Sequence, residues 1–107
     1  MIRADFFKDP NDRLKGFTVS GHAGLADLGQ DVCCASVSSA VMMTANTVTE
    51  VYKIEAKVAV TENEIMLKLG DDPDKNGDKI LLGLLIHLYN LCDEFPSGII
   101  VKVHDAA

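Results

Sequence analysis

Basic residues are scarce in this chain. Its 107 residues include no tryptophan and only 10 lysines and arginines, against 16 aspartates and glutamates, which gives a net charge of −6. Proteins that bind nucleic-acid phosphates need a basic surface, so this balance disfavours direct nucleic-acid binding. It favours a basic protein or peptide as the partner.

Long apolar runs are also missing. The longest, residues 80–88, is interrupted by Gly83 and His87, whereas a membrane-spanning helix needs about 18 consecutive apolar residues. The first ten residues are interspersed with charges and lack the apolar core of a signal peptide. We therefore expect a cytoplasmic protein that makes no membrane contact.

Cysteine is limited to three positions, Cys33, Cys34 and Cys92. An odd number of cysteines in a chain without an export signal predicts reduced thiols. A metal or redox site built from His22, Cys33 and Cys34 has little support, because the chain has no C-x-x-C pair and a disulfide between neighbouring residues is strained. We expect no cofactor and no metal.

The rest of the composition is that of a globular protein, and the length fits one domain, residues 1–107. Alternating apolar and polar residues predict strands, and apolar residues at spacings of three and four predict helices. The expected strands cover residues 2–7, 16–20, 53–60, 64–69 and 99–104, and the expected helices cover residues 31–52 and 79–95. The order ββαββαβ predicts an α+β fold in which a mainly antiparallel sheet packs against two helices.

The segment Gly21–Ser38, with the sequence GHAGLADLGQDVCCASVS, carries the candidate chemistry. Asp31 is a candidate N-cap, because its carboxylate can accept a hydrogen bond from the first turn of a helix. Cys34 would then lie in that first turn, where the helix dipole lowers the pKa of a thiol. His22, upstream at the end of a strand, is a candidate general base. These parts predict nucleophilic catalysis by a thiolate.

Periodicity alone does not separate the two neighbouring cysteines. Adjacent helical residues differ by about 100° in direction, so Cys33 and Cys34 cannot share one role. Cys92 lies within a leucine-rich helix, where a thiol is expected to be a packing residue. His87 and His104 have no comparable surroundings, and we expect them to be structural or solvated.

A family resemblance rests on the same residues. Gly-His-Ala, followed by a loop that ends in Asp-Val-x-Cys-Ala-x-Val-Ser, resembles the bacterial ribosomal-processing cysteine proteases, and the resemblance covers the whole chain. It implies a small cytoplasmic homodimer that removes the N-terminal extension of a large-ribosomal-subunit protein. It makes Cys34 the nucleophile, His22 its catalytic partner, and Asp31 and Ser38 supporting residues. Cys33 is a slight departure from the family pattern.

Three further points follow from this interpretation. Residues 23–30, which include Gly24 and Gly29, are expected to form a substrate-gating loop that orders when a peptide binds. Asp31 either caps the helix or orients His22, and the sequence leaves both roles open. The alternative function is a non-enzymatic ribosome-assembly or scaffold protein, in which the thiols are passive.

Overall fold

The computed structural model describes residues 1–21 and 28–105, with the backbone alone for residues 28–31. Its elements follow the predicted order ββαββαβ. They are β1 (Ile2–Lys8), β2 (Leu14–Ser20), α1 (Leu28–Asn46), the π-helical turn η1 (Thr47–Val51), β3 (Ala56–Val60), β4 (Glu64–Leu69), α2 (Asn76–Glu94) and β5 (Ile99–Asp105). The α+β prediction is confirmed.

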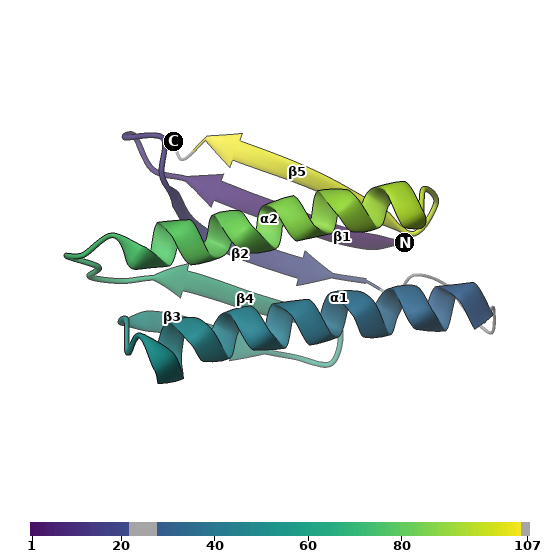
Figure 1. The fold of residues 1–107 in the computed structure, drawn as a ribbon, viewed down its shortest axis with the longest axis horizontal. Helices are drawn as coiled ribbons and strands as arrows, with labels where there is room; N and C mark the ends of the chain where they lie inside the picture. Colours follow the sequence, from purple (N-terminus) through teal and green to yellow (C-terminus); the bar gives the residue numbers. More distant parts are fainter. Residues whose placement is uncertain (22–27, 106–107) are drawn as a thin grey trace.

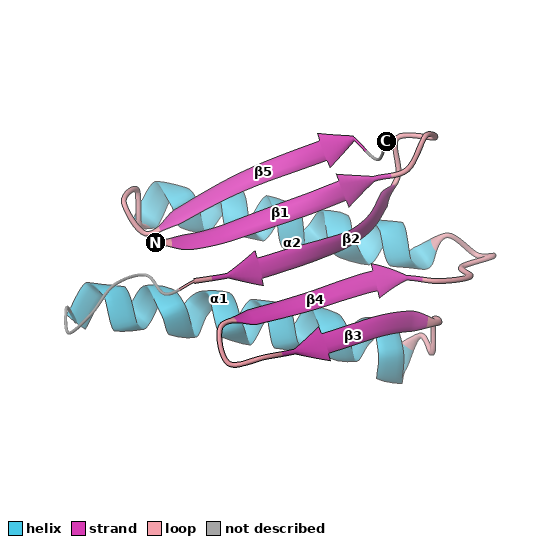
Figure 2. Ribbon diagram, turned by 180° about the vertical axis from the view of Figure 1, so that it is seen from behind, coloured by secondary structure: helices cyan, strands magenta, loops and turns pink. Residues whose placement is uncertain are grey.

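The five strands form one sheet in the order β3-β4-β2-β1-β5. Neighbouring strands are antiparallel except for β1 and β5, which run parallel because α2 carries the chain back across the sheet. Both helices lie side by side on one face of the sheet, as the two opposite views show (Figures 1 and 2). Among the described residues, no helix covers the other face.

The core lies between this helical layer and the sheet. Every second residue of β1 is buried there, namely Ile2, Ala4 and Phe6, because successive strand residues point to opposite faces. The rings of Phe6 and Phe17 lie 5.8 Å apart between their centroids. Leucines of α2 are buried as well, namely Leu81, Leu84, Leu85, Leu88 and Leu91.

One helix boundary differs from the prediction in a way that matters for the site. Because α1 begins at Leu28, Asp31 is the fourth residue of the helix and not its N-cap. Gly29 also belongs to α1 and not to the preceding loop. A capping residue contributes only about 1 kcal/mol and a single helical glycine costs about as much, so neither fixes a helix start on its own. The C-terminal end of this helix agrees with the expected helix over residues 31–52, since η1 extends the helical stretch to Val51.

By length and composition, the stretch Val32–Val51 would suffice to cross a membrane. The search for uninterrupted apolar runs did not find this stretch, because polar residues interrupt it. In the structure, Cys33, Val37, Val41 and Val48 of this stretch are buried in the core. Core helices of globular domains meet the same criteria, so this stretch alone does not indicate a membrane span.

Candidate active site

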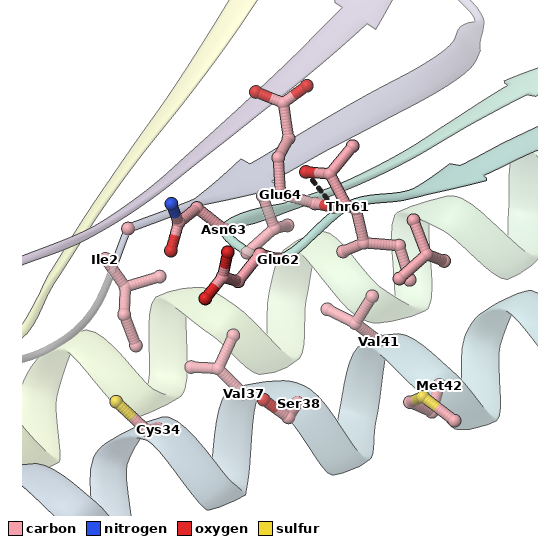
Figure 3. Close-up of a pocket in the computed structure, with 14 residues that line it drawn as sticks. Ile2, Cys34, Val37, Ser38, Val41, Met42, Thr61, Glu62, Asn63 and Glu64 are labelled. Carbon is pink, nitrogen blue, oxygen red and sulfur yellow. Dashed lines mark hydrogen bonds between the residues drawn. The ribbon is translucent and has the colours of Figure 1, made fainter.

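A cavity of about 210 Å³ lies between α1 and the edge of the sheet formed by the start of β1, the end of β2 and the β3–β4 turn (Figure 3). Most of its described wall is apolar. Val37, Val41 and Met42 of α1 face Ile2, Val19 and Ile65 of the sheet. Such a cavity suits an apolar side chain of a ligand.

Of the two neighbouring cysteines, only Cys34 lines the cavity. Cys34 lines the cavity together with Ser38, which lies one helical turn further along α1. Cys33 is only 1% exposed and belongs to the core. A Cβ atom added at Gly98 would lie 2.9 Å from the Cys33 sulfur, so Cys33 is packed closely against the α2–β5 connection.

The two other thiols are poor candidates for a thiolate. Burial raises the pKa of Cys33, and the neighbouring thiols Cys34 and Cys92 raise it further, although the chain's N-terminal ammonium acts in the opposite direction. Burial also raises the pKa of Cys92, helped by Asp93. The nucleophilic form of cysteine is the thiolate, so a raised pKa lowers reactivity. The prediction that Cys92 is a packing residue agrees with its contact with the core.

The remaining predicted site residues are placed only in part. His22 and Gly24 lie outside the described residues, and so does most of the expected gating loop. Asp31 lies in the first turn of α1, with no side chain described. The structure therefore brings Cys34 and Ser38 to one cavity, while the proximity of His22 to Cys34 stays a prediction.

The position of Cys34 within α1 changes one physical expectation. Because α1 begins at Leu28, Cys34 is the seventh helical residue and not part of the first turn. Only the first four N–H groups of a helix lack an intrahelical partner, and the effect of the dipole falls off within the first turn. The prediction that Cys34 lies in the first turn is wrong. The expectation that the helix dipole activates Cys34 therefore loses its structural basis.

The other two histidines agree with the prediction that they are structural or solvated. His87 is exposed on α2. His104 of β5 lies on the sheet face without helices, where its Nε2 atom is 2.7 Å from Oδ1 of Asp5 and its ring stacks on Phe7.

Sequence reasoning missed the importance of Gly21, which also lines the cavity. Gly21 has a φ of +86°, a conformation that favours glycine, and a Cβ atom there would lie 2.6 Å from the carbonyl oxygen of Met1. Its N–H donates a hydrogen bond to the carbonyl oxygen of Asn63, at 3.1 Å. Gly21 thus fixes the end of β2 immediately before His22. A glycine between a strand and a candidate catalytic residue was the available signal.

Comparison with known proteins identifies a family. The family model described as Cysteine protease Prp matches residues 1–100. No curated protein matches the chain.

Solved structures share the fold. A Streptococcus mutans protein has 22% sequence identity and a TM-score of 0.87, with 99% of this chain and 96% of that chain covered. The essential ribosomal processing protease Prp of Staphylococcus aureus, in complex with a substrate peptide, has 17% identity and a TM-score of 0.87, with 97% of this chain and all 100% of that chain covered. The same S. aureus protease with a covalently linked product peptide has 18% identity, the same TM-score of 0.87 and the same coverage of 97% and 100%.

The family match and the fold define a cysteine-type peptidase. The chain belongs to the cysteine protease Prp family.

Proposed function

We propose that this chain is a cysteine endopeptidase that removes the N-terminal extension of a large-ribosomal-subunit protein during ribosome maturation. The observation that carries the proposal is the placement of the three thiols. Cys34 lines an apolar cavity, whereas Cys33 lies in the core and burial raises the pKa of both Cys33 and Cys92. Only Cys34 combines access to a ligand with the family motif.

The proposed reaction uses Cys34 as nucleophile and His22 as base. His22 takes the proton from the Cys34 thiol, and the sulfur attacks the scissile carbonyl carbon. The peptide C–N bond breaks, the new amine leaves with the proton from His22, and the extension remains bound to Cys34 as a thioester. Water then hydrolyses the thioester and releases the extension. Gly21 supports the role of His22, because it lines the cavity and directly precedes His22 in the sequence.

Asp31 and Ser38 are assigned supporting roles. The start of α1 at Leu28 removes the capping role of Asp31, so we assign it the second role considered above, orientation of His22. Ser38 lines the cavity one turn from Cys34, and we assign it a hydrogen bond to a bound peptide. The role of Gly24 in a gating loop stays a prediction.

The substrate assignment rests on the family and on two structural relatives. The two S. aureus structures contain a ribosomal processing protease, one with a substrate peptide and one with a covalently linked product peptide. By analogy we propose a ribosomal protein substrate, a homodimer and a cytoplasmic location for this chain. Light scattering coupled to size-exclusion chromatography tests the homodimer, because a dimer doubles the mass of the 11.6 kDa chain.

The decisive experiment incubates the purified protein with an N-terminally extended ribosomal protein and records intact masses. The wild type is expected to release the extension, and the variants Cys34→Ala and His22→Ala are expected to leave it in place. Cys33→Ala is the matched control, because it removes the adjacent thiol without touching the cavity. Cleavage by Cys34→Ala, or its loss in a folded Cys33→Ala variant, would contradict the assignment of the nucleophile. Unimpaired maturation in cells that carry Cys34→Ala would favour the scaffold alternative.

A further inference from the structure

The β3–β4 turn places an acidic side chain over the candidate active site. Glu62 and Glu64 both line the cavity. In Figure 3 the carboxylate of Glu62 is directed toward α1, on the side of Val37 and Cys34, while that of Glu64 is directed away from α1. Of the two, Glu62 is therefore the carboxylate that a bound peptide would meet.

The turn that carries Glu62 is held in place on both sides. The Thr61 N–H donates to the carbonyl oxygen of Glu64 at 2.8 Å, and this bond closes the hairpin. On the other side, the Asn63 carbonyl accepts the bond from Gly21 at 3.1 Å. A side chain on a fixed turn binds a ligand at a lower entropic cost than one on a loose loop.

Glu62 has no lysine or arginine partner within the described part of the chain. No lysine or arginine is among the described residues that line the cavity. The carboxylate of Glu62 forms no ion pair or hydrogen bond with a described residue. A carboxylate without an ion-pair partner beside an apolar cavity attracts a cationic group and repels an anionic one.

We propose that Glu62 is a specificity-determining residue that selects peptides with a lysine or arginine close to the apolar residue bound in the cavity. This inference rests on the proposed function of the Cys34 site and adds the class of substrate. The apolar wall holds an apolar side chain, and Glu62 pairs with the basic side chain next to it. The net charge of −6 reinforces the attraction between the chain and a basic peptide.

The test uses a set of peptides derived from the extension and its cleavage site. Each position from four before to four after the scissile bond carries lysine in one peptide and glutamine in another, and kcat/KM is measured for every pair. At one position the wild type is expected to prefer lysine about two- to fivefold, the range of a solvent-exposed ion pair. The preference should weaken as salt is raised, because exposed charges are screened.

Three variants assign the preference to one side chain. Glu62→Gln is expected to abolish it, and Glu62→Lys to reverse it, so that the glutamine peptide becomes the better substrate. Glu64→Gln is the matched control and is expected to keep it, because its carboxylate is directed away from α1 (Figure 3). An unchanged lysine preference in Glu62→Gln, or no preference at any position in a wild type that cleaves the peptides, overturns the inference alone.

A wild type that cleaves none of the peptides contradicts the proposed function. In that case fluorescence anisotropy of the same labelled peptides with Cys34→Ala still tests Glu62 through binding. The lysine peptide is expected to bind two- to fivefold more tightly than the glutamine peptide, and Glu62→Gln in the same background should remove the difference. Equal binding of the two peptides overturns the role of Glu62.

Discussion

The backbone N–H of Gly21 donates a hydrogen bond to the carbonyl oxygen of Asn63 at 3.1 Å and so joins the end of β2 to the β3–β4 turn. Gly21 precedes the candidate base His22, and Asn63 follows the candidate specificity residue Glu62. One hydrogen bond therefore connects two of the three sheet segments that border the cavity.

Replacing Gly21 with alanine is expected to damage both stability and activity. The new Cβ would lie 2.6 Å from the Met1 carbonyl oxygen, and the φ of +86° is unfavourable for alanine. We expect a loss of about 1–3 kcal/mol in the free energy of unfolding, measured by urea denaturation, and a lower kcat/KM.

Gly83→Ala is the matched control for this substitution. Gly83 lies within α2, and a Cβ there would have no neighbour within 4 Å. Alanine is the better helix former, so this variant should gain about 0.5–1 kcal/mol and keep its activity. Equal stability of the Gly21→Ala variant and the wild type would show that the end of β2 is not constrained as described.

The three thiols are expected to react with iodoacetamide at different rates. Cys34 lines the cavity, whereas burial raises the pKa of Cys33 and Cys92 and lowers the fraction of thiolate. Peptide mapping at pH 7 should find Cys34 labelled first, and the lag of the other two should vanish in denaturant. Faster labelling of Cys33 in the folded protein would contradict the packing described here.

Asp5, on the sheet face without helices, is expected to make the stability of the protein sensitive to acid. Burial of Asp5 opposes its ionisation, but hydrogen bonds from Arg3 and His104, at 2.9 and 2.7 Å, outweigh that effect and lower its pKa. A lowered pKa in the folded state stabilises the protein above the unfolded pKa of about 3.9, and this contribution is lost as the pH falls below it through the folded value.

The Asp5→Asn variant tests this contribution. It should lose about 1 kcal/mol of unfolding free energy at pH 6, and the difference from wild type should shrink between about pH 4 and pH 2. Thermal unfolding across this range provides the measurement. Lys8 and Asp12 form a more exposed ion pair at 2.8 Å, so Asp12→Asn is the control with a smaller expected effect. A constant difference between wild type and Asp5→Asn at all pH values would rule out the linkage.

Much of the fold was predictable because its signals are local. The spacing of the leucines in α2 and the alternation in β1 each place apolar residues on one face, and burial against the other layer follows from that. The start of α1 was not predictable, since the energies of a cap and of a helical glycine are small and nearly cancel.

For the candidate site, the sequence indicated residue types but not their arrangement in space. The family motif indicated Cys34, whereas its predicted place in the first turn of the helix was wrong. The separation of Cys34 from Cys33 by burial depends on how α1 lies against the sheet. The contact of Gly21 with Met1 depends on the pairing of β1 with β2, which places Arg3 opposite Ser20. The direction of Glu62 depends on the pairing of β4 with β2. Such contacts join residues far apart in the sequence, and no local pattern encodes them.

The packing of Cys33 against Gly98 predicts an energetic coupling between two residues far apart in the sequence. A Cβ at Gly98 would lie 2.9 Å from the Cys33 sulfur and 3.3 Å from the Cβ of Phe95. Gly98→Ala is expected to cost about 1–3 kcal/mol through overpacking. Cys33→Ala removes the sulfur and should cost about 1 kcal/mol on its own.

The double variant distinguishes a specific contact from general strain. Because Cys33→Ala makes room for the new methyl group, the double variant should be more stable than the sum of the single losses implies, by about 0.5–2 kcal/mol. Urea denaturation of all four proteins gives this coupling energy, and peptide hydrolysis should persist in each of them that is folded. Strictly additive losses would show that the cost of the methyl group at position 98 does not depend on the Cys33 sulfur, and that Cys33 is not held by this contact.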